Sequence, residues 1–350
     1  MERVLMSGND AIGRGAILAG CKFFYGYPIT PQSEIMEYVA RELPKAGGVF
    51  LQAECELSTA GMVYGSAMTG ARSMTASSGP GVSLMQEFVS FMSFAQVPAV
   101  IVVVTRYGPG TGLAQSTQTD YRQLTKGGGH GGYHCIVLAP WSPQECLEQV
   151  QLAFYLADKY RIVVYVLADA NIGQIVEPVE ARTLDLGLLP EKEWAVAGRD
   201  RRGGKPMPYA MPDFVGYHLK QNEKYKKIEE TEVRYQTYQT DDMDLLIVAH
   251  GSVARWAQGA VDMAREQGYR VGLLRPITQW PFPSQAVREA ALRAGKVLVV
   301  EKSSGLMVED VEFAVLKQVP VHLLGIWGCH QAGAFPPIYA ERIVEEVKKL

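Results

Sequence analysis

The stretch Ala99-Val100-Ile101-Val102-Val103-Val104-Thr105 is an unbroken run of small and β-branched residues. A continuous apolar run is typical of a strand that is buried on both faces, as in a parallel sheet with helices on either side. Shorter runs lie to both sides of it, at residues 49–52, 72–76, 135–138 and 162–167. Each is followed by a break and then by residues with helical spacing. This alternation predicts βα units and a doubly wound α/β domain over residues 1–180.

A second, smaller α/β unit is expected over residues 243–350. Apolar runs of strand length recur there at residues 245–250, 271–274, 297–301 and 319–324, and a helix is expected over 338–350. Between the two units, residues 181–242 are rich in charge, Pro and Gly. We interpret this segment as a connector that lies on a surface of the chain or of a partner, anchored mainly by Tyr217, Tyr225, Tyr235 and Tyr238.

Composition and charge exclude several classes of protein. The 350 residues are 47% apolar and 20% charged, which is the balance of an ordinary packed protein. Lys and Arg number 34 against 37 Asp and Glu, a net charge of −3, so the basic face needed for nucleic acid or an anionic membrane is not indicated. The longest apolar run, residues 97–104, is far shorter than the roughly 20 residues that span a bilayer. We therefore expect a cytoplasmic protein.

The cysteines do not indicate a metal site. All five are scattered, and none forms a C-x-x-C pair that would favour a disulfide framework, zinc or an iron–sulfur cluster. Cys329 and His330 are adjacent, but one pair of neighbours is a weak metal signal, and a packed thiol is the simpler interpretation. We expect no metal to be bound by this chain alone.

The first candidate site is the turn Gly26-Tyr27-Pro28-Ile29-Thr30-Pro31, which follows the apolar pair Phe23-Phe24 and precedes a helical stretch. In open α/β sheets, ligands bind beyond the carboxyl ends of strands, where such turns lie. Pro31 suits a first helical turn, and Thr30 would then lie near the cap with its hydroxyl toward the crevice. The alternative is a simple capped turn.

Two further candidates follow predicted strands. Glu54, with Glu56 two residues later, enters a helix rich in small residues, where a carboxylate becomes partly buried and its pKa is perturbed. The alternative is an acid that favours the helix N-terminus. Arg106 directly follows the longest strand and could clamp a carboxylate, or form a salt bridge at the rim of the sheet.

Two glycine-rich segments, residues 77–81 and 126–132, would let backbone approach a cofactor closely. Neither matches a phosphate-binding fingerprint. His130, in the second segment, could act in acid–base chemistry, although a lone histidine in a glycine loop is more often structural or exposed.

These motifs, taken in order, resemble the 2-oxoacid:ferredoxin oxidoreductase family. The likeness rests on Tyr27-Pro28-Ile29-Thr30-Pro31, on Gln52 and Glu54, and on Arg106. It extends through Ser78-Gly79-Pro80-Gly81, Leu84-Met85-Gln86-Glu87, residues 229–235, Arg275-Pro276-Ile277-Thr278, Trp280-Pro281-Phe282-Pro283 and Met307-Val308-Glu309-Asp310. The matching subunit is the α-type chain, whose first domain holds the aminopyrimidine end of thiamine diphosphate and whose second domain is similar to the C-terminal domain of transketolase.

The resemblance implies a role for each matching residue. Glu54 corresponds to the carboxylate on N1′ of the aminopyrimidine, through which the 4′-imino group takes the C2 proton of the thiazolium. Tyr27, Pro28 and Ile29 would contact the cofactor. Thr30 and Arg106 correspond to the positions that hold the carboxylate and carbonyl of a 2-oxo acid. The reaction implied is oxidative decarboxylation to an acyl-CoA and CO₂, with electrons passing to ferredoxin.

The substrate and the partners are also expectations from the resemblance. Gly127-Gly128-Gly129-His130-Gly131 and Leu138-Ala139-Pro140 look most like the branched-chain type, which acts on 2-oxoisovalerate; 2-oxoglutarate and pyruvate are the alternatives. Around residues 301–306, Ser and Leu stand where the family usually has Asn and Gln, so the contacts of that loop differ. A non-catalytic assembly or regulatory subunit is the alternative of another class.

The chain has no Gly-Asp-Gly motif for the diphosphate and Mg²⁺ and no clustered cysteines. We therefore expect a hetero-oligomer in which a β subunit binds the diphosphate and Mg²⁺. Subunits of the γ and ferredoxin-like types would carry the iron–sulfur clusters, with coenzyme A as co-substrate.

Overall fold

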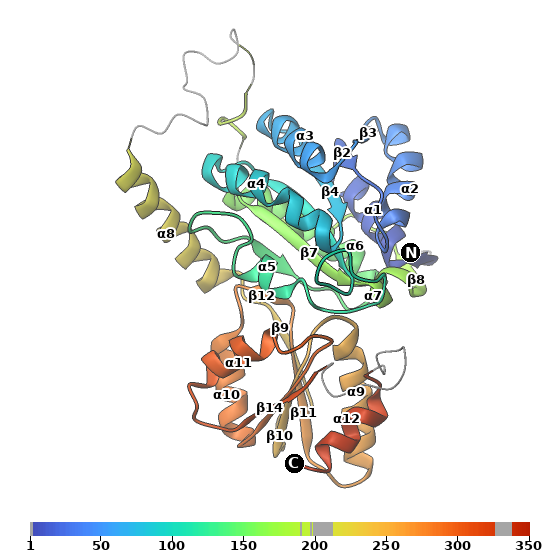
Figure 1. Ribbon diagram of the computed structural model, residues 1–350, viewed down its shortest axis with the longest axis vertical. Coiled ribbons are helices and arrows are strands. Elements are labelled where there is room, and N and C mark those ends of the chain that lie inside the picture. Colours follow the sequence, from blue (N-terminus) through green and yellow to red (C-terminus); the bar gives the residue numbers. More distant parts are fainter. Residues whose placement is uncertain (1–2, 190, 197, 199–212, 326–337) are drawn as a thin grey trace.

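The computed structural model describes residues 3–189, 191–196, 198, 213–325 and 338–350, and it divides into two α/β units (Figure 1). The first contains a seven-stranded sheet and the second a five-stranded sheet. The predicted fold class is therefore confirmed. Part of the connector predicted over residues 181–242, namely residues 190, 197 and 199–212, lies outside the described residues, as do Cys329 and His330.

The larger sheet has the order β12-β6-β7-β5-β4-β2-β3. Its strands are β2 (Phe23–Gly26), β3 (Val49–Gln52), β4 (Ser73–Ser77), β5 (Ala99–Thr105), β6 (Ile136–Leu138), β7 (Val163–Asp169) and β12 (Thr278–Trp280). All neighbours are parallel except β12, which runs antiparallel to β6. Every residue of β5 is buried, as its continuous apolar sequence predicts.

Helices cover both faces of this sheet (Figure 1). On one face α1 (Gly8–Leu18) packs against α2 (Ser33–Glu42) and α6 (Pro143–Tyr160); on the other, α3 (Glu56–Met68) packs against α4 (Gly79–Ala95). Shorter elements complete the unit, namely η1 (Pro44–Ala46), α5 (Tyr121–Thr125), α7 (Ala170–Gln174) and an antiparallel ribbon of β1 (Arg3–Ser7) and β8 (Val176–Glu180). The parallel arrangement brings the carboxyl ends of β2, β3, β4 and β5 to one edge, where the candidate residues lie.

The smaller sheet has the order β14-β13-β10-β11-β9. It consists of β9 (Tyr235–Tyr238), β10 (Leu245–Val248), β11 (Val271–Pro276), β13 (Val297–Val300) and β14 (Val321–Leu324), with β9 antiparallel and the others parallel. Its helices form two pairs on opposite faces, α9 (Gly251–Glu266) with α12 (Ala340–Val347) and α10 (Ser284–Ala294) with α11 (Met307–Val315) (Figure 1).

The later part of the predicted connector contains a helix, α8 (Phe214–Thr231), which the sequence analysis did not predict. It lies along the first unit, where Tyr225 and Ile228 are buried and the Tyr217 hydroxyl donates to the carbonyl oxygen of Phe94 at 2.9 Å. Of the predicted tyrosine anchors, Tyr217 and Tyr225 thus contact the chain's own first unit, and Tyr235 and Tyr238 lie in β9.

Buried polar contacts join the two units. Arg275 in β11 is 2% exposed and donates two hydrogen bonds to the Glu145 carboxylate of α6, at 2.7 and 2.8 Å. Its guanidinium also lies 4.0 Å from the centre of the Trp141 ring. Because β12 completes the sheet of the first unit, the two units share backbone pairing as well as side-chain contacts.

The segment over residues 301–306 is organised by a buried carboxylate. Glu301 is fully buried and accepts hydrogen bonds from the backbone N–H groups of Leu306, Met307 and Val308 at 3.0–3.1 Å. The Ser303 hydroxyl donates to it at 2.6 Å. Ser303 and Glu301 together therefore hold the loop that leads into α11.

Candidate active site

Three side chains donate hydrogen bonds to carbonyl oxygens of the turn over residues 26–34. Gln32 Nε2 donates to Tyr27 at 3.0 Å, Asn9 Nδ2 donates to Pro31 at 2.9 Å, and Arg106 Nη1 donates to Thr30 at 3.1 Å. Helix α2 begins only at Ser33, with Gln32 as its N-cap. The expectation that Pro31 lies in the first helical turn is therefore wrong. The Gln32 side chain donates back to Tyr27, so that the turn ends at Gln32 and the helix begins after it.

Arg106 and Thr30, which are 76 residues apart in the sequence, contact each other. Arg106 directly follows β5, and Thr30 lies in the turn that follows β2. The Nε atom of Arg106 is buried and has no hydrogen-bond partner among the described residues. A guanidinium that is positioned by a backbone carbonyl and retains an unpaired N–H is well suited to bind an anion.

The two candidate carboxylates differ sharply in environment. Glu54 is exposed, and a hydrogen bond from the Ser58 hydroxyl at 2.5 Å lowers its pKa. Glu56 is only 4% exposed and is the first residue of α3. The expectation that Glu54 becomes partly buried is thus wrong for this chain by itself. Strand β3 ends at Gln52, and the intervening turn directs Glu54 to solvent and Glu56 inward.

Glu56 lies against the start of α4. A Cβ atom at Gly81 would be 2.2 Å from Glu56 Oε1 and 2.2 Å from Ser77 Oγ, so these two oxygens converge on the glycine. The hydroxyls of Ser77 and Ser78 are buried without partners among the described residues. These buried hydroxyls, the Glu56 carboxylate and Gly81 together form a polar cradle. A bound group would supply the hydrogen-bond partners that the hydroxyls lack.

Asp120 is a member of the site that the sequence analysis missed. Its Oδ2 accepts a hydrogen bond from the Gly79 N–H at 3.3 Å, and burial raises its pKa to about 6, although the backbone bond and Arg106 oppose this shift. Gly79 in turn lies beside the Arg106 side chain. No motif marks Asp120 in the sequence, because its partners lie in distant segments, Gly79 at the start of α4 and Arg106 directly after β5.

The glycine segment over residues 126–132 lies elsewhere. Its Gly128 and Gly129 pack against Gln86 in the middle of α4, and the carbonyl oxygen of His130 accepts a hydrogen bond from the Ser90 hydroxyl at 2.8 Å. The side chain of His130 is exposed. Neither contact joins this loop to Glu56 or Arg106.

In the described part of the chain, no three His, Cys, Asp or Glu side chains are grouped so that they could hold a metal ion. No helix in that part has the length and apolarity needed to cross a membrane.

Comparison with known families identifies this arrangement. A family model described as "Pyruvate flavodoxin/ferredoxin oxidoreductase, thiamine diP-bdg" matches residues 14–242. The chain belongs to the 2-oxoacid:ferredoxin oxidoreductase family. A second model, "Pyruvate:ferredoxin oxidoreductase core domain II", matches residues 243–331. The predicted family and its thiamine diphosphate-binding domain are thus confirmed.

Relatives with different substrate names are found within the family. The chain is 47% identical over 317 residues to "Ketoisovalerate oxidoreductase subunit VorB" of Methanothermobacter marburgensis, with 90% of each chain covered. It is 39% identical over 353 residues to "2-oxoglutarate synthase subunit KorA" of Methanothermobacter thermautotrophicus, with 92% of this chain and 94% of the relative covered.

Solved structures agree with the fold. The 2-oxoglutarate:ferredoxin oxidoreductase from Magnetococcus marinus, with 2-oxoglutarate, coenzyme A and succinyl-CoA bound, superposes with a TM-score of 0.84 at 26% identity. The match covers 99% of this chain and 65% of that longer chain. An inactive split-gene transketolase tetramer has a TM-score of 0.60 at 13% identity, covering 98% of this chain and 97% of that one. It confirms the predicted transketolase-like architecture only at the level of fold.

Proposed function

We propose that the chain is the α-type subunit of a 2-oxoisovalerate:ferredoxin oxidoreductase and that it holds the aminopyrimidine end of thiamine diphosphate together with the 2-oxo acid. The observation that carries the proposal is the contact of Arg106 with Thr30. Arg106 also lies beside Gly79, the first residue of α4. Two residues further along this helix, Gly81 lies against the carboxylate of Glu56 and the hydroxyl of Ser77. The identity with the ketoisovalerate enzyme subunit supports the choice of substrate.

The residues of the cradle fit the cofactor. A thiamine site needs a carboxylate at N1′ of the aminopyrimidine, and the chain offers two. The resemblance selects Glu54, whereas the fold buries Glu56. We assign the role to Glu56, because a carboxylate shielded from water interacts more strongly with a bound ring nitrogen. When bound, thiamine diphosphate supplies the electron sink that decarboxylation requires.

The substrate-binding side of the site is formed by Arg106. Its Nη1 is fixed by Thr30, and its buried Nε remains free for a carboxylate oxygen. Orientation of the substrate carboxylate before CO₂ departs lowers the entropic part of the barrier. Tyr27, Pro28 and Ile29 border the same turn, and we propose that they contact the cofactor.

The remaining components are assigned to partner chains. We propose a β subunit that binds the diphosphate and Mg²⁺, together with γ-type and ferredoxin-like subunits that carry iron–sulfur clusters, coenzyme A as co-substrate and ferredoxin as acceptor. The absence of a Gly-Asp-Gly motif and of clustered cysteines from the sequence supports this division. We place the assembled enzyme in the cytoplasm.

The proposal is tested on the native complex, isolated through a tag on this chain. Reduction of a viologen dye is followed with coenzyme A and a panel of 2-oxo acids. The highest kcat/KM is expected with 2-oxoisovalerate. A preference for 2-oxoglutarate, which the 39% identical relative makes the second candidate, would retain the family reaction and overturn the substrate.

A matched pair of variants tests the carboxylate. Glu56→Gln is expected to lower kcat by at least about 100-fold, while Glu54→Gln changes it less than about threefold. The reverse result would return the role to Glu54. Full activity in both variants would favour a non-catalytic assembly subunit.

A further inference from the structure

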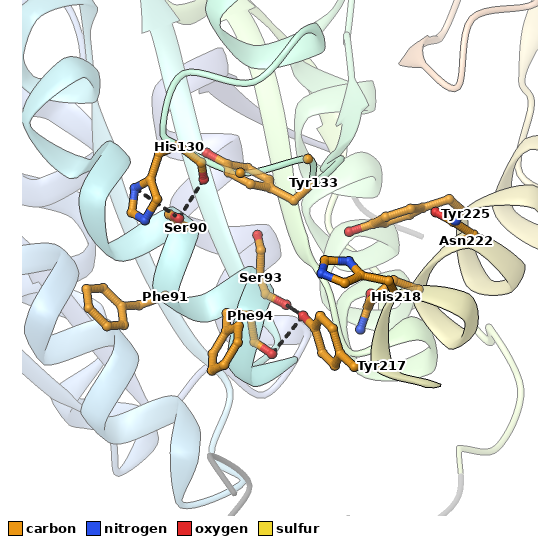
Figure 2. A pocket seen from close by; sticks show the side chains of 13 residues that line it. Ser90, Phe91, Ser93, Phe94, His130, Tyr133, Tyr217, His218, Asn222 and Tyr225 are labelled. Atoms are coloured by element: carbon orange, nitrogen blue, oxygen red, sulfur yellow. Dashed lines mark hydrogen bonds between the residues drawn. The ribbon is translucent and has the colours of Figure 1, made fainter. Parts of the chain in front are cut away.

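A cavity of about 320 Å³ lies between the second half of α4, the glycine loop over residues 126–132 and α8 (Figure 2). It is separate from the candidate active site. From Gly79, at the active-site end of α4, to Ser93, which lines the cavity, the helix rises by about 21 Å at about 1.5 Å per residue. None of the residues that we assign to thiamine diphosphate or to the 2-oxo acid lines it.

The walls of the cavity are fixed in place. Tyr217 Oη donates to the carbonyl oxygen of Phe94 at 2.9 Å and thereby ties α8 to α4. The glycine loop is tied to α4 by the bond from Ser90 to His130, and its Gly129 N–H donates to Tyr133 Oη at 3.0 Å. Since all three walls are held by direct contacts, the cavity is formed before any ligand binds, as small-molecule sites usually are.

The lining favours a flat, uncharged ligand. Figure 2 shows the rings of Tyr133, Tyr217 and Tyr225 around a hollow, with Ser93 between them. Two further phenylalanines and two imidazoles also line the cavity, whereas none of the described lining side chains is Asp, Glu, Lys or Arg. Aromatic walls stack on planar ring systems, and a lining without carboxylate, ammonium or guanidinium groups does not select a strongly charged group.

Two buried groups in the lining lack a hydrogen-bond partner among the described residues. Gln221 is 5% exposed, and its side-chain oxygen has no partner among the described residues. An unpaired buried acceptor of this kind costs about 1–3 kcal/mol, which a donor on a ligand would recover. The Ser93 hydroxyl, 6% exposed, is likewise buried without a hydrogen-bond partner among the described residues.

We propose that this cavity binds the adenine base of a nucleotide-containing ligand. The ring stacks between the tyrosines, the exocyclic amine donates to Gln221, and the Ser93 hydroxyl donates to a ring nitrogen. A cavity of this volume is at the small end for ligand sites and suits a base rather than a whole dinucleotide. Coenzyme A and free adenine nucleotides share this base.

Calorimetric titration of the full chain with adenosine and with inosine tests the base site. Inosine carries a carbonyl oxygen where adenosine carries the amine, so it should bind at least about tenfold more weakly. Gln221→Leu should remove this discrimination, whereas Glu223→Gln, exposed on the same helix and outside the lining, should retain it.

Absence of adenosine binding, or equal binding of the two nucleosides by the unaltered chain, would overturn the proposal. Either result is independent of whether any variant folds.

The assembled enzyme distinguishes the two sources of the base, and only this comparison rests on the proposed function. If the base belongs to coenzyme A, Gln221→Leu raises KM for coenzyme A at least about fivefold and leaves KM for pantetheine, which lacks adenine, unchanged. If it belongs to a free nucleotide, KM for coenzyme A is unchanged and AMP or ATP raises the Tm of the unaltered enzyme but not of Gln221→Leu. If Gln221→Leu alters neither the KM for coenzyme A nor the nucleotide-dependent Tm, the proposal is overturned.

Discussion

Gly81 shows how closely single atoms are fitted in the candidate site. An added Cβ would approach Glu56 Oε1 and Ser77 Oγ to 2.2 Å, a distance that real Cβ contacts do not reach. We expect Gly81→Ala to displace the Glu56 carboxylate and to lower kcat/KM of the complex at least about tenfold. The chain should still fold, because alanine is favourable in a helix.

Gly65 provides the control. It lies in the interior of α3, and a Cβ there would meet no atom within 4 Å. Gly65→Ala should therefore leave kcat/KM unchanged. Loss of activity in both variants would show that the effect comes from helix geometry and not from the carboxylate.

Arg106 is expected not to tolerate replacement by lysine. Its guanidinium donates to Thr30 through Nη1, while Nε is buried and has no partner among the described residues. The compact ammonium of lysine lacks the planar fork that presents donors toward Thr30 and toward a bound carboxylate at the same time. Arg106→Lys should raise KM for the 2-oxo acid at least about tenfold. Steady-state kinetics measures this change, with Arg122→Lys at an exposed site as control. An unchanged KM would remove Arg106 from the substrate site.

The choice between Glu54 and Glu56 marks the limit of sequence reasoning at this scale. Both acids lie between the end of the same strand and the first residue of the same helix, so spacing does not separate them. The direction in which residues 53–55 leave the sheet decides which one is buried, and that direction depends on packing against the start of α4. The pairing of Thr30 with Arg106, by contrast, could be predicted, because both follow strands of one parallel sheet.

Among the elements, the Glu301 loop is the most dependent on one side chain. Its carboxylate receives backbone N–H groups at the start of α11 and the Ser303 hydroxyl. Glu301→Gln removes the charge and presents an NH₂ group to the same donors. Because charge-assisted hydrogen bonds are worth about 1.5–3 kcal/mol, we expect the free energy of unfolding to fall by about 2–3 kcal/mol.

Urea titration checks this expectation as a lower midpoint at unchanged slope. Glu312→Gln, exposed on the same helix, should leave the midpoint within about 0.5 kcal/mol. A midpoint shared by all three proteins would contradict the role of Glu301.

The elements that could be predicted are those whose own sequence has a clear hydrophobic pattern. Strands such as β5 and β13 are continuous apolar runs, and they appear where expected. The strands β9, with sequence YQTY, and β12, with only three residues, do not have this pattern. They form because β11 and β6 offer open edges, so their stability comes from partners distant in the chain. Helix α8 has a highly charged sequence and few buried residues, so its sequence also lacks a clear hydrophobic pattern and the helix was not predicted.

At the scale of the whole molecule, a buried histidine joins the two units. His250, at the start of α9, is 2% exposed, and its carbonyl oxygen accepts a hydrogen bond from Gln118 of the first unit at 2.9 Å. Burial lowers its pKa to about 4, although Asp169 in β7 opposes this shift, and the Tyr121 ring covers one side. The folded chain therefore keeps this imidazole neutral.

The lowered pKa predicts a pH dependence of stability. Between pH 6.5 and pH 4, His250 is protonated in the unfolded chain but stays neutral in the folded chain. The free energy of unfolding therefore decreases as the pH falls through this range. From pH 7.5 to pH 5 we expect His250 to contribute a loss of about 2 kcal/mol. Urea titrations of the unaltered chain and of His250→Gln at both pH values isolate this contribution. Equal losses in the two proteins would contradict it.

The pairing of β12 with β6 also decides how the polypeptide can be divided. Residues 278–280 come from the second unit but complete the sheet of the first. A fragment that ended near residue 242 would leave the backbone N–H and C=O groups of one side of β6 unpaired, next to the apolar β7. Such an edge pairs readily with other chains. A gene that separates the two units would therefore be expected to yield a first fragment that aggregates, unless the second fragment is produced beside it.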